Sequence, residues 1–412
     1  MELTLKPSTG WKRQMVVIWI SQWLSIMGFS FAFPFVPFFL QADLGIVGED
    51  NIAFWVSMFA FSTAVSMGLA APFWGALADR FGRRIMLIRA TLCGAACMSL
   101  MGGVRSAGVL IFLRTVQGAL TGTMTAAQAF VSGEVPPERR GLAIGGLSAA
   151  VFSGSMSGSF VGGFVADRIG YRAAFYCSGL LLLVSGLLIV FATRETAFVP
   201  TPRQPKKSAE PPATPIWRSL TPSIWIALGL IALLSFIRQQ DMPFIPLLVQ
   251  KILGSLDAAS LWTGWVNATG SVAGLLAGLL AGWMADRLSP RRILLTAAAL
   301  AIGFASAQGV VGSFATLFPI RFMTVFVVGF IEPTLNAILA KQTPESCQGR
   351  VFGWASTTRS IGWALGPLLA GWLVADQGLA SVFFAAGIGY ALLFLLLLVL
   401  PIARARKNGL AM

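Results

Sequence analysis

The stretch 75-GALADRFGRRIML-87 concentrates charge in a chain that is otherwise strongly apolar. Four charged residues fall within six positions: Asp79, Arg80, Arg83 and Arg84. A related stretch, 282-GWMADRLSPRRIL-294, recurs far downstream. Because each stretch lies between long apolar runs, the pattern indicates charged loops that join membrane-spanning helices, and its recurrence indicates a duplicated chain.

The composition excludes an ordinary water-soluble domain. Of 412 residues, 56% are hydrophobic and only 11% are charged, whereas an average soluble domain has about 25% charged residues. The chain is therefore expected to be an integral membrane protein, with the lipid bilayer as its main partner. The formal net charge is +14. Because no basic stripe with interleaved aromatic residues is present, we attribute this charge to cytoplasmic loops and expect no nucleic-acid partner.

The reactive side chains argue against a metal site or an enzyme. The chain has four cysteines and no histidine, and no two cysteines have the Cys-x-x-Cys spacing of a zinc site. Cys93 and Cys97 share one helix face, where packing explains them. The sequence has no phosphate-binding loop and no plausible serine triad. We therefore expect neither a metal nor a catalytic residue.

A run of about 20 mostly apolar residues is needed for a helix to cross a bilayer. Twelve such runs are predicted: 14–40, 53–75, 86–104, 108–131, 141–166, 171–193, 222–249, 259–284, 292–311, 314–340, 350–376 and 379–401. Segment 194–221 is rich in Pro, Lys and Arg, which predicts an exposed cytoplasmic linker. The predicted domains are therefore an N-terminal six-helix bundle, 1–193, and a C-terminal six-helix bundle, 222–412.

Lysine and arginine residues indicate the orientation. With the N-terminus inside, 21 of the 30 Lys and Arg residues lie in inner segments and 4 lie in outer loops. Because positive residues are retained on the cytoplasmic side, both termini are expected to be cytoplasmic. The residues before Trp11 are few and polar, so no cleavable signal is expected ahead of the first span.

The chain repeats itself with nearly constant spacing. A shift of 207 residues relates Gly75 to Gly282, Asp79 to Asp286 and Arg114 to Arg321. A shift of 209 residues relates 34-PFVPFFLQ-41 to 243-PFIPLLVQ-250. Six spans are an even number, so the two halves share one orientation, which is a known plan for transporters with a site between parallel repeats.

The charged loop after span two predicts a cytoplasmic latch between helices. Gly75 would permit close backbone approach or a tight exit from span two. Asp79 would accept hydrogen bonds from helix N-termini or from arginine, and Arg83 and Arg84 would anchor span three to anionic headgroups. Positive-inside anchoring alone is the alternative, but it explains the arginines and not the repeated Gly-x-x-x-Asp-Arg pattern.

The predicted cytoplasmic gate combines both copies of this loop. Its residues are Gly75, Asp79, Arg80, Gly82, Arg83, Arg84, Asp286 and Arg287. The second copy has Ser289 and Pro290 where the first has Gly82 and Arg83. A weaker latch is therefore expected in the second half.

The pattern Gly75-x-x-x-Asp79-Arg80-x-Gly82-Arg83-Arg84 resembles the signature loop of the major facilitator superfamily. The stretches 72-PFWGALADRFGRRIMLIRA-90 and 110-LIFLRTVQGALTG-122 are similar to MdtG-type multidrug exporters of its drug:proton antiporter branch. The resemblance covers nearly the whole chain. It implies an all-α fold of twelve transmembrane helices in two pseudo-symmetric six-helix bundles, in the inner membrane of a bacterium. It also implies export of lipophilic or cationic small molecules in exchange for protons by alternating access, hence antibiotic resistance, with no cofactor and a monomeric protein.

Polar residues form one stripe along span four. They are Arg114, Gln117, Gly118, Thr121, Gly122, Thr125 and Gln128, which fall within an arc of about 140° on a helix. Arg114 lies about 9 Å from the outer end of the span, where a cation is costly and indicates function. The alternative is an arginine that reaches the outer headgroups. In the antiporter branch the arginine of Arg-x-x-Gln-Gly is implicated in proton coupling, and the resemblance gives that role to Arg114.

Two acidic residues lie well inside predicted spans, Asp241 and Glu332. Asp241 lies about 12 Å deep, and Arg238, three residues earlier, could contact it. Burial and a nearby arginine act in opposite directions on the proton affinity of a carboxyl group. Movement of Asp241 relative to Arg238 could therefore load and release a proton, although a static ion pair is the alternative. Glu332 could act likewise or attract a cationic substrate. The predicted proton-coupling residues are Asp241, Glu332, Arg114 and Arg238.

Span one has no acidic residue, although many exporters of this branch carry one there. Its polar residues are Ser21, Gln22, Ser25 and Ser30. The two halves therefore differ in charge where they would face each other.

Small residues recur at every fourth position in spans five and eleven. The pattern Gly154-x-x-x-Gly158-Ser159-x-x-Gly162-Gly163 resembles the antiporter-associated motif of drug exporters, which has proline at the place of Ser159. Such residues let helices approach closely, and the resemblance adds that these interfaces limit leakage. The predicted packing residues are Gly154, Gly158, Gly162, Gly366 and Pro367.

The predicted substrate pocket is lined by spans one, four, seven and ten. Its candidates are Gln22, Gln117, Thr121, Arg321, Asn336, Phe31 and Phe236. A roomy pocket with few charges suits amphipathic compounds of varied shape. Two alternatives stay open: export of one endogenous metabolite, such as a siderophore or a sugar, and a non-transporting membrane sensor. The two near-intact loops and the intramembrane charges argue against the sensor.

Overall fold

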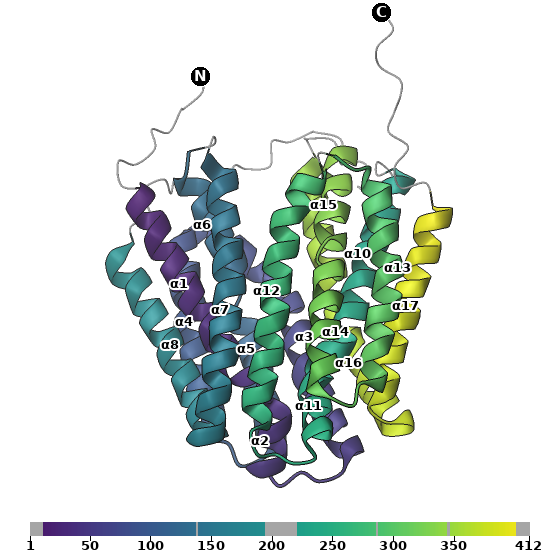
Figure 1. Ribbon diagram of the computed structural model, residues 1–412. Coiled ribbons are helices and arrows are strands. Elements are labelled where there is room, and N and C mark those ends of the chain that lie inside the picture. The colour runs from purple at the N-terminus through teal and green to yellow at the C-terminus, as the bar shows by residue number, and fades with distance from the viewer. Residues whose placement is uncertain (1–10, 137–138, 194–220, 286, 344–346, 401–412) are drawn as a thin grey trace, which may run out of the picture. The chain divides into compact units, whose positions relative to one another are not determined.

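The computed structural model describes residues 11–136, 139–193, 221–285, 287–343 and 347–400. Every secondary-structure element in these residues is helical, as the all-α prediction requires (Figure 1). The chain divides into two compact units. Unit 1 comprises Met1–Gln204 and Pro243–Val272, and unit 2 comprises Pro205–Met242 and Ala273–Met412.

The two units differ from the two halves that the sequence repeat predicts. The repeat places the boundary in 194–221, whereas Pro243–Val272 of the second half packs in unit 1. This segment contains α11 (Ile245–Leu253) and the first part of α12 (Ala259–Ala285). Hydrogen bonds and close backbone contacts with unit 1, described below, explain the grouping.

Unit 1 consists of long helices joined by short loops. Its other elements are α1 (Trp11–Ala32), the 3-10 turn η1 (Phe33–Phe35), α2 (Val36–Ala42), α3 (Glu49–Phe81), α4 (Arg83–Gly102), α5 (Ala107–Leu120), α6 (Thr123–Glu134), α7 (Arg140–Arg168) and α8 (Tyr171–Ala192). One core cluster of this unit includes Ile18, Leu87, Phe130, Leu147 and Ile189. Because these residues come from five different helices, their close packing joins α1, α4, α6, α7 and α8.

Helix α1 packs closely against α7 because glycines of α7 face it. A Cβ atom at Gly158 or Gly162 would overlap the carbonyl oxygen of Met27 or Phe31, respectively. A Cβ atom at Gly154 would come within 2.7 Å of another carbonyl oxygen of α1. The spacing of small residues in span five thus corresponds to a crossing of two backbones, which larger side chains would separate.

Serine side chains join α1 to α8 inside the apolar core. The Oγ of Ser185 lies 2.7 Å from the Oγ of Ser21 and 2.8 Å from the Oγ of Ser25. The Ser185 hydroxyl also donates to the carbonyl oxygen of Ser21 at 2.9 Å. Hydrogen bonds of this kind link helices in membranes, so two of the polar residues of span one have a structural role.

Unit 2 is built in the same way. Its elements are α10 (Pro222–Asp241), the rest of α12, α13 (Pro290–Ala307), η4 (Gln308–Val310), α14 (Phe314–Val328), α15 (Ile331–Gln342), α16 (Gln348–Gln377) and α17 (Ala380–Val399). The turn η3 (Met242–Phe244) follows α10, and the chain passes from unit 2 to unit 1 within it. Gly362 and Gly366 of α16 face α10, where a Cβ atom at either would lie 2.6 Å from a carbonyl oxygen. Helix α16 continues through Pro367.

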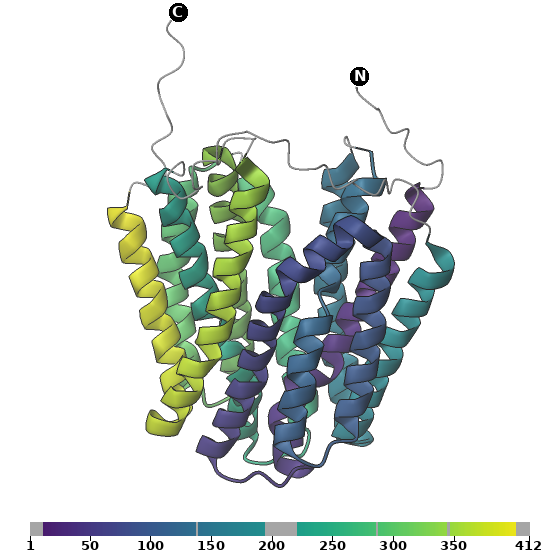
Figure 2. The same ribbon diagram turned by 180° about the vertical axis from the view of Figure 1, so that it is seen from behind.

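Helix α3 is the longest element of unit 1, with 33 residues, and it bends along its last third (Figure 2). Pro72 lies inside the helix. Proline removes one backbone hydrogen bond and pushes against the preceding turn, which bends a helix.

Ten of the described helical segments are long and apolar enough to cross a membrane, against twelve predicted spans. Predicted span eleven is α16, which is long but more polar and carries Arg359 near its middle. Predicted span four consists of two short helices, because the chain breaks at Gly122 with φ 130°. Predicted span ten breaks at the equivalent Gly329. The single helix expected for 108–131 is therefore wrong in this detail, whereas the span expected for 314–340 is confirmed as one candidate span, Phe314–Gln342, with a turn at Gly329.

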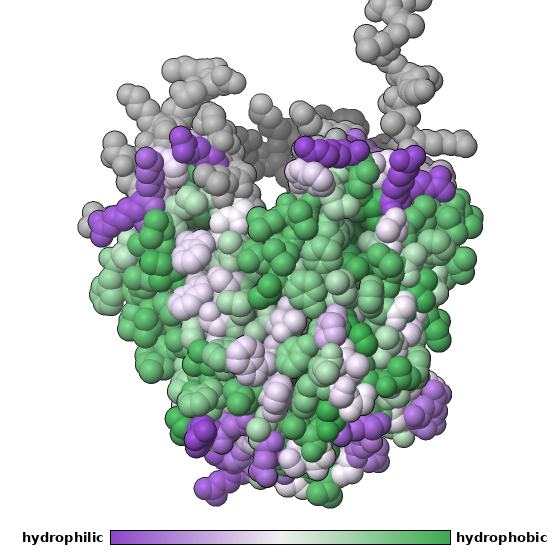
Figure 3. Space-filling view, viewed as in Figure 1, coloured by the Kyte–Doolittle hydropathy of each residue, from purple (hydrophilic) through white to green (hydrophobic). Residues whose placement is uncertain are grey.

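Hydrophobic residues cover the flanks of the helices, and hydrophilic residues gather at the helix ends (Figure 3). Apolar flanks suit the hydrocarbon core of a bilayer, and polar ends suit its two interfaces; the helix lengths given above agree with this arrangement. The chain is thus a multi-pass membrane protein.

Candidate transport site

A buried ion pair joins two helices of unit 2. Asp241, the last residue of α10, accepts a hydrogen bond from Nη1 of Arg321 on α14 at 2.6 Å. The same nitrogen donates to Oε1 of Gln308 at 3.3 Å. The side chains of Asp241 and Arg321 are only 12% and 10% exposed, respectively. Two opposite charges therefore balance each other in a place that solvent barely reaches.

The partner of Asp241 is not the expected one. The sequence placed Arg238 within reach on the same helix, but Arg238 donates to Glu332 on α15 instead, at 2.6 Å. Spacing of three residues permits contact on a helix without requiring it. A pairing between helices gives Asp241 and Arg238 one partner each, so the predicted Arg238–Asp241 pair is wrong.

Glu332 lies between two arginines. Its Oε2 accepts from Arg238 on α10, and its Oε1 lies 3.1 Å from Nε of Arg359 on α16. The cluster therefore ties three helices of unit 2 together. Arg359 is absent from the predicted site, although an arginine in the middle of a span is itself a signal of function.

Arg114 of α5 has no acidic partner within ion-pair distance among the described residues of the chain. Its guanidinium carbon lies 3.7 Å from the ring centre of Phe33 and 4.5 Å from that of Phe59. Its Nη1 donates to Oε1 of Gln117 at 2.6 Å. Aromatic faces attract cations, so two rings and one amide stabilise a charge that is otherwise costly in a membrane.

The predicted pocket residues fall in both units. Gln22, Phe31, Gln117 and Thr121 lie in unit 1, and Phe236, Arg321 and Asn336 lie in unit 2. Phe31 is buried, and its backbone contacts Gly162 where α1 crosses α7. Nε2 of Gln22 and Oδ1 of Asn336 are buried without a hydrogen-bond partner. Buried polar atoms are usually paired, so these two atoms indicate where a polar ligand or water would fit.

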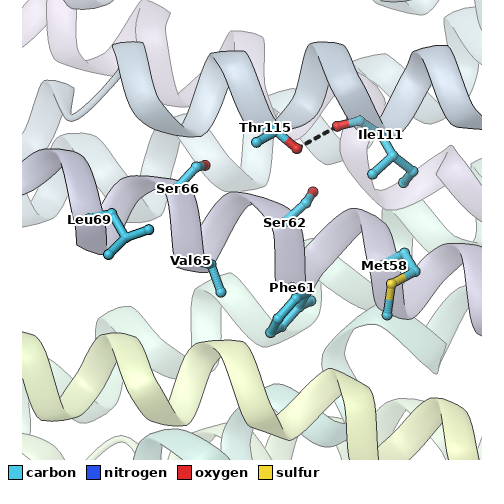
Figure 4. A pocket seen from close by; sticks show the side chains of 8 residues that line it. All are labelled: Met58, Phe61, Ser62, Val65, Ser66, Leu69, Ile111 and Thr115. Atoms are coloured by element: carbon cyan, nitrogen blue, oxygen red, sulfur yellow. Dashed lines mark hydrogen bonds between the residues drawn. The ribbon is translucent and has the colours of Figure 1, made fainter.

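An apolar depression of about 330 Å³ lies between α3 and α5 (Figure 4). Its lining residues are Met58, Phe61, Ser62, Val65, Ser66, Leu69, Ile111 and Thr115. The Thr115 hydroxyl donates to the carbonyl oxygen of Ile111 in its own helix, at 2.8 Å. None of the predicted pocket residues lines this depression, and its apolar side chains offer little to select a polar ligand.

The charged loop turns at Gly82 and not at Gly75. Helix α3 continues past Gly75 to Phe81, and a Cβ atom at Gly75 would meet no described atom within 4 Å. Gly82 has φ 91°, a conformation that favours glycine. The close approach or tight exit expected at Gly75 is therefore wrong, and Gly82 is the glycine that the turn requires.

Arginines of both loop copies cap neighbouring helices. Arg84 donates from Nη2 to the carbonyl oxygen of Val190 at 2.6 Å and from Nε to Oγ1 of Thr193 at 3.2 Å, at the end of α8. Arg291 donates to the carbonyl oxygen of Leu398 at 2.9 Å, at the end of α17. Such contacts satisfy terminal carbonyl groups and place a cation at the negative end of a helix. The headgroup anchor expected at Arg84 is thus a contact inside the protein.

The second copy of the charged loop leads into α13 with residues that favour the start of a helix. Pro290 is the first residue of α13, and the Oγ of Ser289 accepts from the backbone N–H of Arg292 at 3.4 Å. Serine at the cap and proline at the first position favour a helix start. The predicted gate residue Asp286 and the side chain of Asp79 lie outside the described residues.

Two further gate arginines, Arg80 and Arg287, lie near aromatic rings. The guanidinium of Arg80 lies 5.2 Å from the ring centre of Phe81, and that of Arg287 lies 4.1 Å from the ring centre of Trp283. These contacts hold cations near the ends of α3 and α12, as expected for charged loops beside a membrane.

A family model identifies the chain. The model of the Major Facilitator Superfamily matches residues 18–262 and 242–411. The chain belongs to the Major Facilitator Superfamily. It is therefore a membrane transporter and not an enzyme.

Relatives of this superfamily member match along nearly its whole length. The multidrug resistance protein MdtG of Citrobacter koseri is 30% identical over 375 residues, which cover 91% of each chain. MdtG of Klebsiella pneumoniae is 29% identical over 376 residues, which cover 91% of this chain and 90% of the relative.

Two solved structures show the same fold. The nucleoside transporter NupG matches with a TM-score of 0.77 at 11% identity, covering 93% of this chain and 98% of its own. The human organic anion transporter MFSD10 matches with a TM-score of 0.68 at 17% identity, covering 94% and 99%.

Repeat-equivalent glutamines of this superfamily member pair with each other inside unit 1. Gln41 at the end of α2 and Gln250 in α11 exchange two amide hydrogen bonds, of 2.9 Å and 2.8 Å. They are the last residues of the repeated stretches 34–41 and 243–250. The C-terminal ends of the two copies of this stretch are therefore hydrogen-bonded to each other.

A second contact set lies where α12 begins. The carboxylate of Asp167 on α7 accepts from the backbone N–H groups of Ser260 and Leu261, at 3.3 Å and 2.9 Å. An acid at a helix N-terminus satisfies free N–H groups and favours the helix dipole. A Cβ atom at Gly163 would lie 2.5 Å from the Ser260 carbonyl oxygen, and one at Gly264 would lie 2.5 Å from an α7 carbonyl oxygen. These contacts explain why Pro243–Val272 groups with unit 1.

Proposed function

We propose that this transporter exports lipophilic or cationic small molecules in exchange for protons, by alternating access, in a bacterial inner membrane with both termini cytoplasmic. The observation that carries the proposal is the buried pair of Asp241 and Arg321. The name of the MdtG relatives, multidrug resistance protein, supports the substrate class. A proton gradient would supply the energy, so the scheme uses no cofactor.

Asp241 is the proposed proton carrier. While Arg321 donates to it, the charge of the carboxylate is balanced. If a conformational change separates the pair, an uncompensated charge remains in a buried place, which is costly. Uptake of a proton removes that charge. Loading on the outer side and release on the inner side would then accompany each export cycle.

Glu332, Arg238 and Arg359 form the second proposed coupling cluster. Protonation of Glu332 would free two arginines on α10 and α16 at once, which would link its charge to the positions of three helices. A cationic substrate could also compete with the arginines for the carboxylate. Arg114 contributes a fixed positive charge, because a guanidinium does not release its proton in proteins.

The remaining groups are proposed to form the pocket and two gates. Gln22 and Asn336 would contact the substrate through their buried, unpaired amide atoms. The two charged loops would close the cytoplasmic side. The Gln41–Gln250 pair would close the outer side, where the expected orientation places it.

Locking the outer contact should stop transport. In a background that lacks the four native cysteines, Gln41→Cys and Gln250→Cys would place two thiols at the site of a direct side-chain contact. We expect cross-linking to abolish dye transport and a reductant to restore it, because alternating access requires this contact to open. Each single cysteine variant is the matched control. Undiminished transport by fully cross-linked protein would contradict a gate at this position.

Proteoliposomes test the proposed exchange. One side is acidified, a panel of permanently cationic and neutral dyes is offered, and the dye and the internal pH are followed together. We expect dye to accumulate on the acidic side while the pH difference decays faster than in protein-free liposomes. An ionophore that collapses the gradient should stop accumulation. Dye movement at the same rate with and without the gradient would contradict proton exchange.

A further inference from the structure

Arg114 and Arg321 occupy equivalent places in the two repeats. A shift of 207 residues relates them. Each lies eight residues before the glycine at which its span breaks, Gly122 or Gly329. The two arginines thus have the same position relative to a helix interruption, although Gly122 has φ 130° and Gly329 keeps a helical φ of −59°.

The segments next to these arginines are also equivalent. A shift of 209 residues relates 34–41 to 243–250, and it carries Ala32 onto Asp241. Helix α1 ends at Ala32 and a 3-10 turn begins at the next residue, just as α10 ends at Asp241 before its own 3-10 turn. Ala32 is 1% exposed, so the equivalent of the buried acid is a buried methyl group.

The partners of the two arginines nevertheless differ. Arg321 has a carboxylate oxygen of Asp241 at 2.6 Å. Arg114 has instead an aromatic ring from the residue after Ala32, Phe33, and a second ring from α3. Each arginine also donates to one amide oxygen. The first site is therefore a cation between rings, and the second is a cation beside an acid.

We infer that Arg114 is the non-titrating copy of a duplicated arginine site, and that residue 32 determines which kind of site the first repeat has. With alanine at this position, aromatic faces stabilise the cation and no group is present that binds a proton. A carboxylate at position 32 would pair with Arg114 as Asp241 pairs with Arg321. On the basis of the proposed function, Arg114 is then a positioning residue that joins α5, α3 and the turn after α1, and it carries no proton itself.

A double-mutant cycle of thermal unfolding tests this pairing without any transport measurement. Ala32→Asp and Arg114→Gln are made singly and together in the full chain, at neutral pH. We expect Ala32→Asp to be far more destabilising beside Gln than beside Arg114, by at least about tenfold in the unfolding equilibrium, because only the arginine balances a buried carboxylate. Ala32→Asn is the neutral control of the same size and should show much weaker coupling, because its amide oxygen can accept a hydrogen bond but carries no charge. Equal destabilisation of both backgrounds by Ala32→Asp would overturn the inference, as would failure of Ala32→Asp to fold where Ala32→Asn folds.

A second cycle examines the rings and does not depend on position 32. Phe59→Leu is combined with the native Arg114, with Arg114→Lys and with Arg114→Gln. Phe59 is buried and contacts the Phe33 ring, so Phe59→Leu should lower the melting temperature in every background. We expect a larger loss where position 114 carries a charge than beside Gln, since only a cation is attracted by the ring. Additive effects in all three backgrounds would overturn the inference.

Measurements of transport by Arg114 variants then distinguish a positioning role of Arg114 from proton binding by Arg114. Arg114→Lys should retain most of the rate, and Arg114→Gln should lower the maximal rate without moving the pH midpoint of transport. A shifted midpoint in both variants would place Arg114 in the proton site and overturn the inference. Absence of gradient-driven transport in the native protein would contradict the proposed function alone, since both unfolding cycles are independent of it.

Discussion

Replacing Asp241 with asparagine should reduce gradient-driven accumulation of dye to the level of protein-free liposomes. Asparagine has nearly the same shape and can still accept from Arg321, but it cannot bind and release a proton. Downhill exchange of dye should persist, because the fold and the pocket are retained. The measurement compares native and variant protein in proteoliposomes, with and without a pH difference. Glu332→Gln is tested in parallel, and full accumulation in both variants would contradict the proposed assignment of the coupling acids.

The stability of the Asp241 variant needs its own control. Removal of one partner from a buried pair typically costs about 3–5 kcal/mol, whereas removal of both charges is often neutral. Arg321 is only 10% exposed, so Asp241→Asn should lower the melting temperature. The double variant Asp241→Asn with Arg321→Gln should regain stability without regaining proton coupling. Recovery of coupling in the double variant would contradict Asp241 as the carrier.

Replacing Gly162 with valine should prevent stable folding of unit 1. A Cβ atom at this position would overlap the carbonyl oxygen of Phe31 and lie 2.8 Å from its carbonyl carbon. Overpacking costs about 1–3 kcal/mol where side chains can move. Here the obstacle is backbone, which has no other rotamer, so we expect a loss at or above the upper end of that range. Melting temperature in detergent and yield of membrane-inserted protein are the measurements.

Gly145 offers a matched control on the same helix. A Cβ atom at Gly145 would meet no described atom within 4 Å, and the residue is exposed. Gly145→Val should therefore leave the melting temperature nearly unchanged. Equal losses from Gly162→Val and Gly145→Val would show that valine itself, and not the crossing of α1 and α7, causes the damage.

Much of the helical plan could be predicted from hydropathy alone. The predicted span 171–193 corresponds to α8, Tyr171–Ala192. A long apolar run forms a helix in the bilayer because its backbone N–H and C=O groups must be hydrogen-bonded within the segment. The breaks at Gly122 and Gly329 could not be predicted in this way. Glycine is common in membrane helices, and its presence does not reveal whether the helix is interrupted there, as at Gly122 with φ 130° and at Gly329 with a helical φ of −59°.

The ion pairs lay beyond sequence reasoning for a similar reason. Local spacing indicated only that Arg238 could reach Asp241, whereas the actual partner of Asp241 is 80 residues away along the chain. The repeat did show that Arg114 and Arg321 are equivalent. It could not show that one lies between rings and the other beside an acid, because those partners come from other helices.

Proton release on binding of substrate tests most directly whether Asp241 is the proton carrier. Purified protein in detergent and weakly buffered solution is mixed with a dye that proteoliposomes have shown to be transported, and the pH of the solution is recorded. We expect the native protein to release protons when the dye binds, because dye binding would favour the state in which Arg321 balances the Asp241 carboxylate. Asp241→Asn should bind the dye without releasing any. Equal proton release by both proteins would contradict the central role of Asp241.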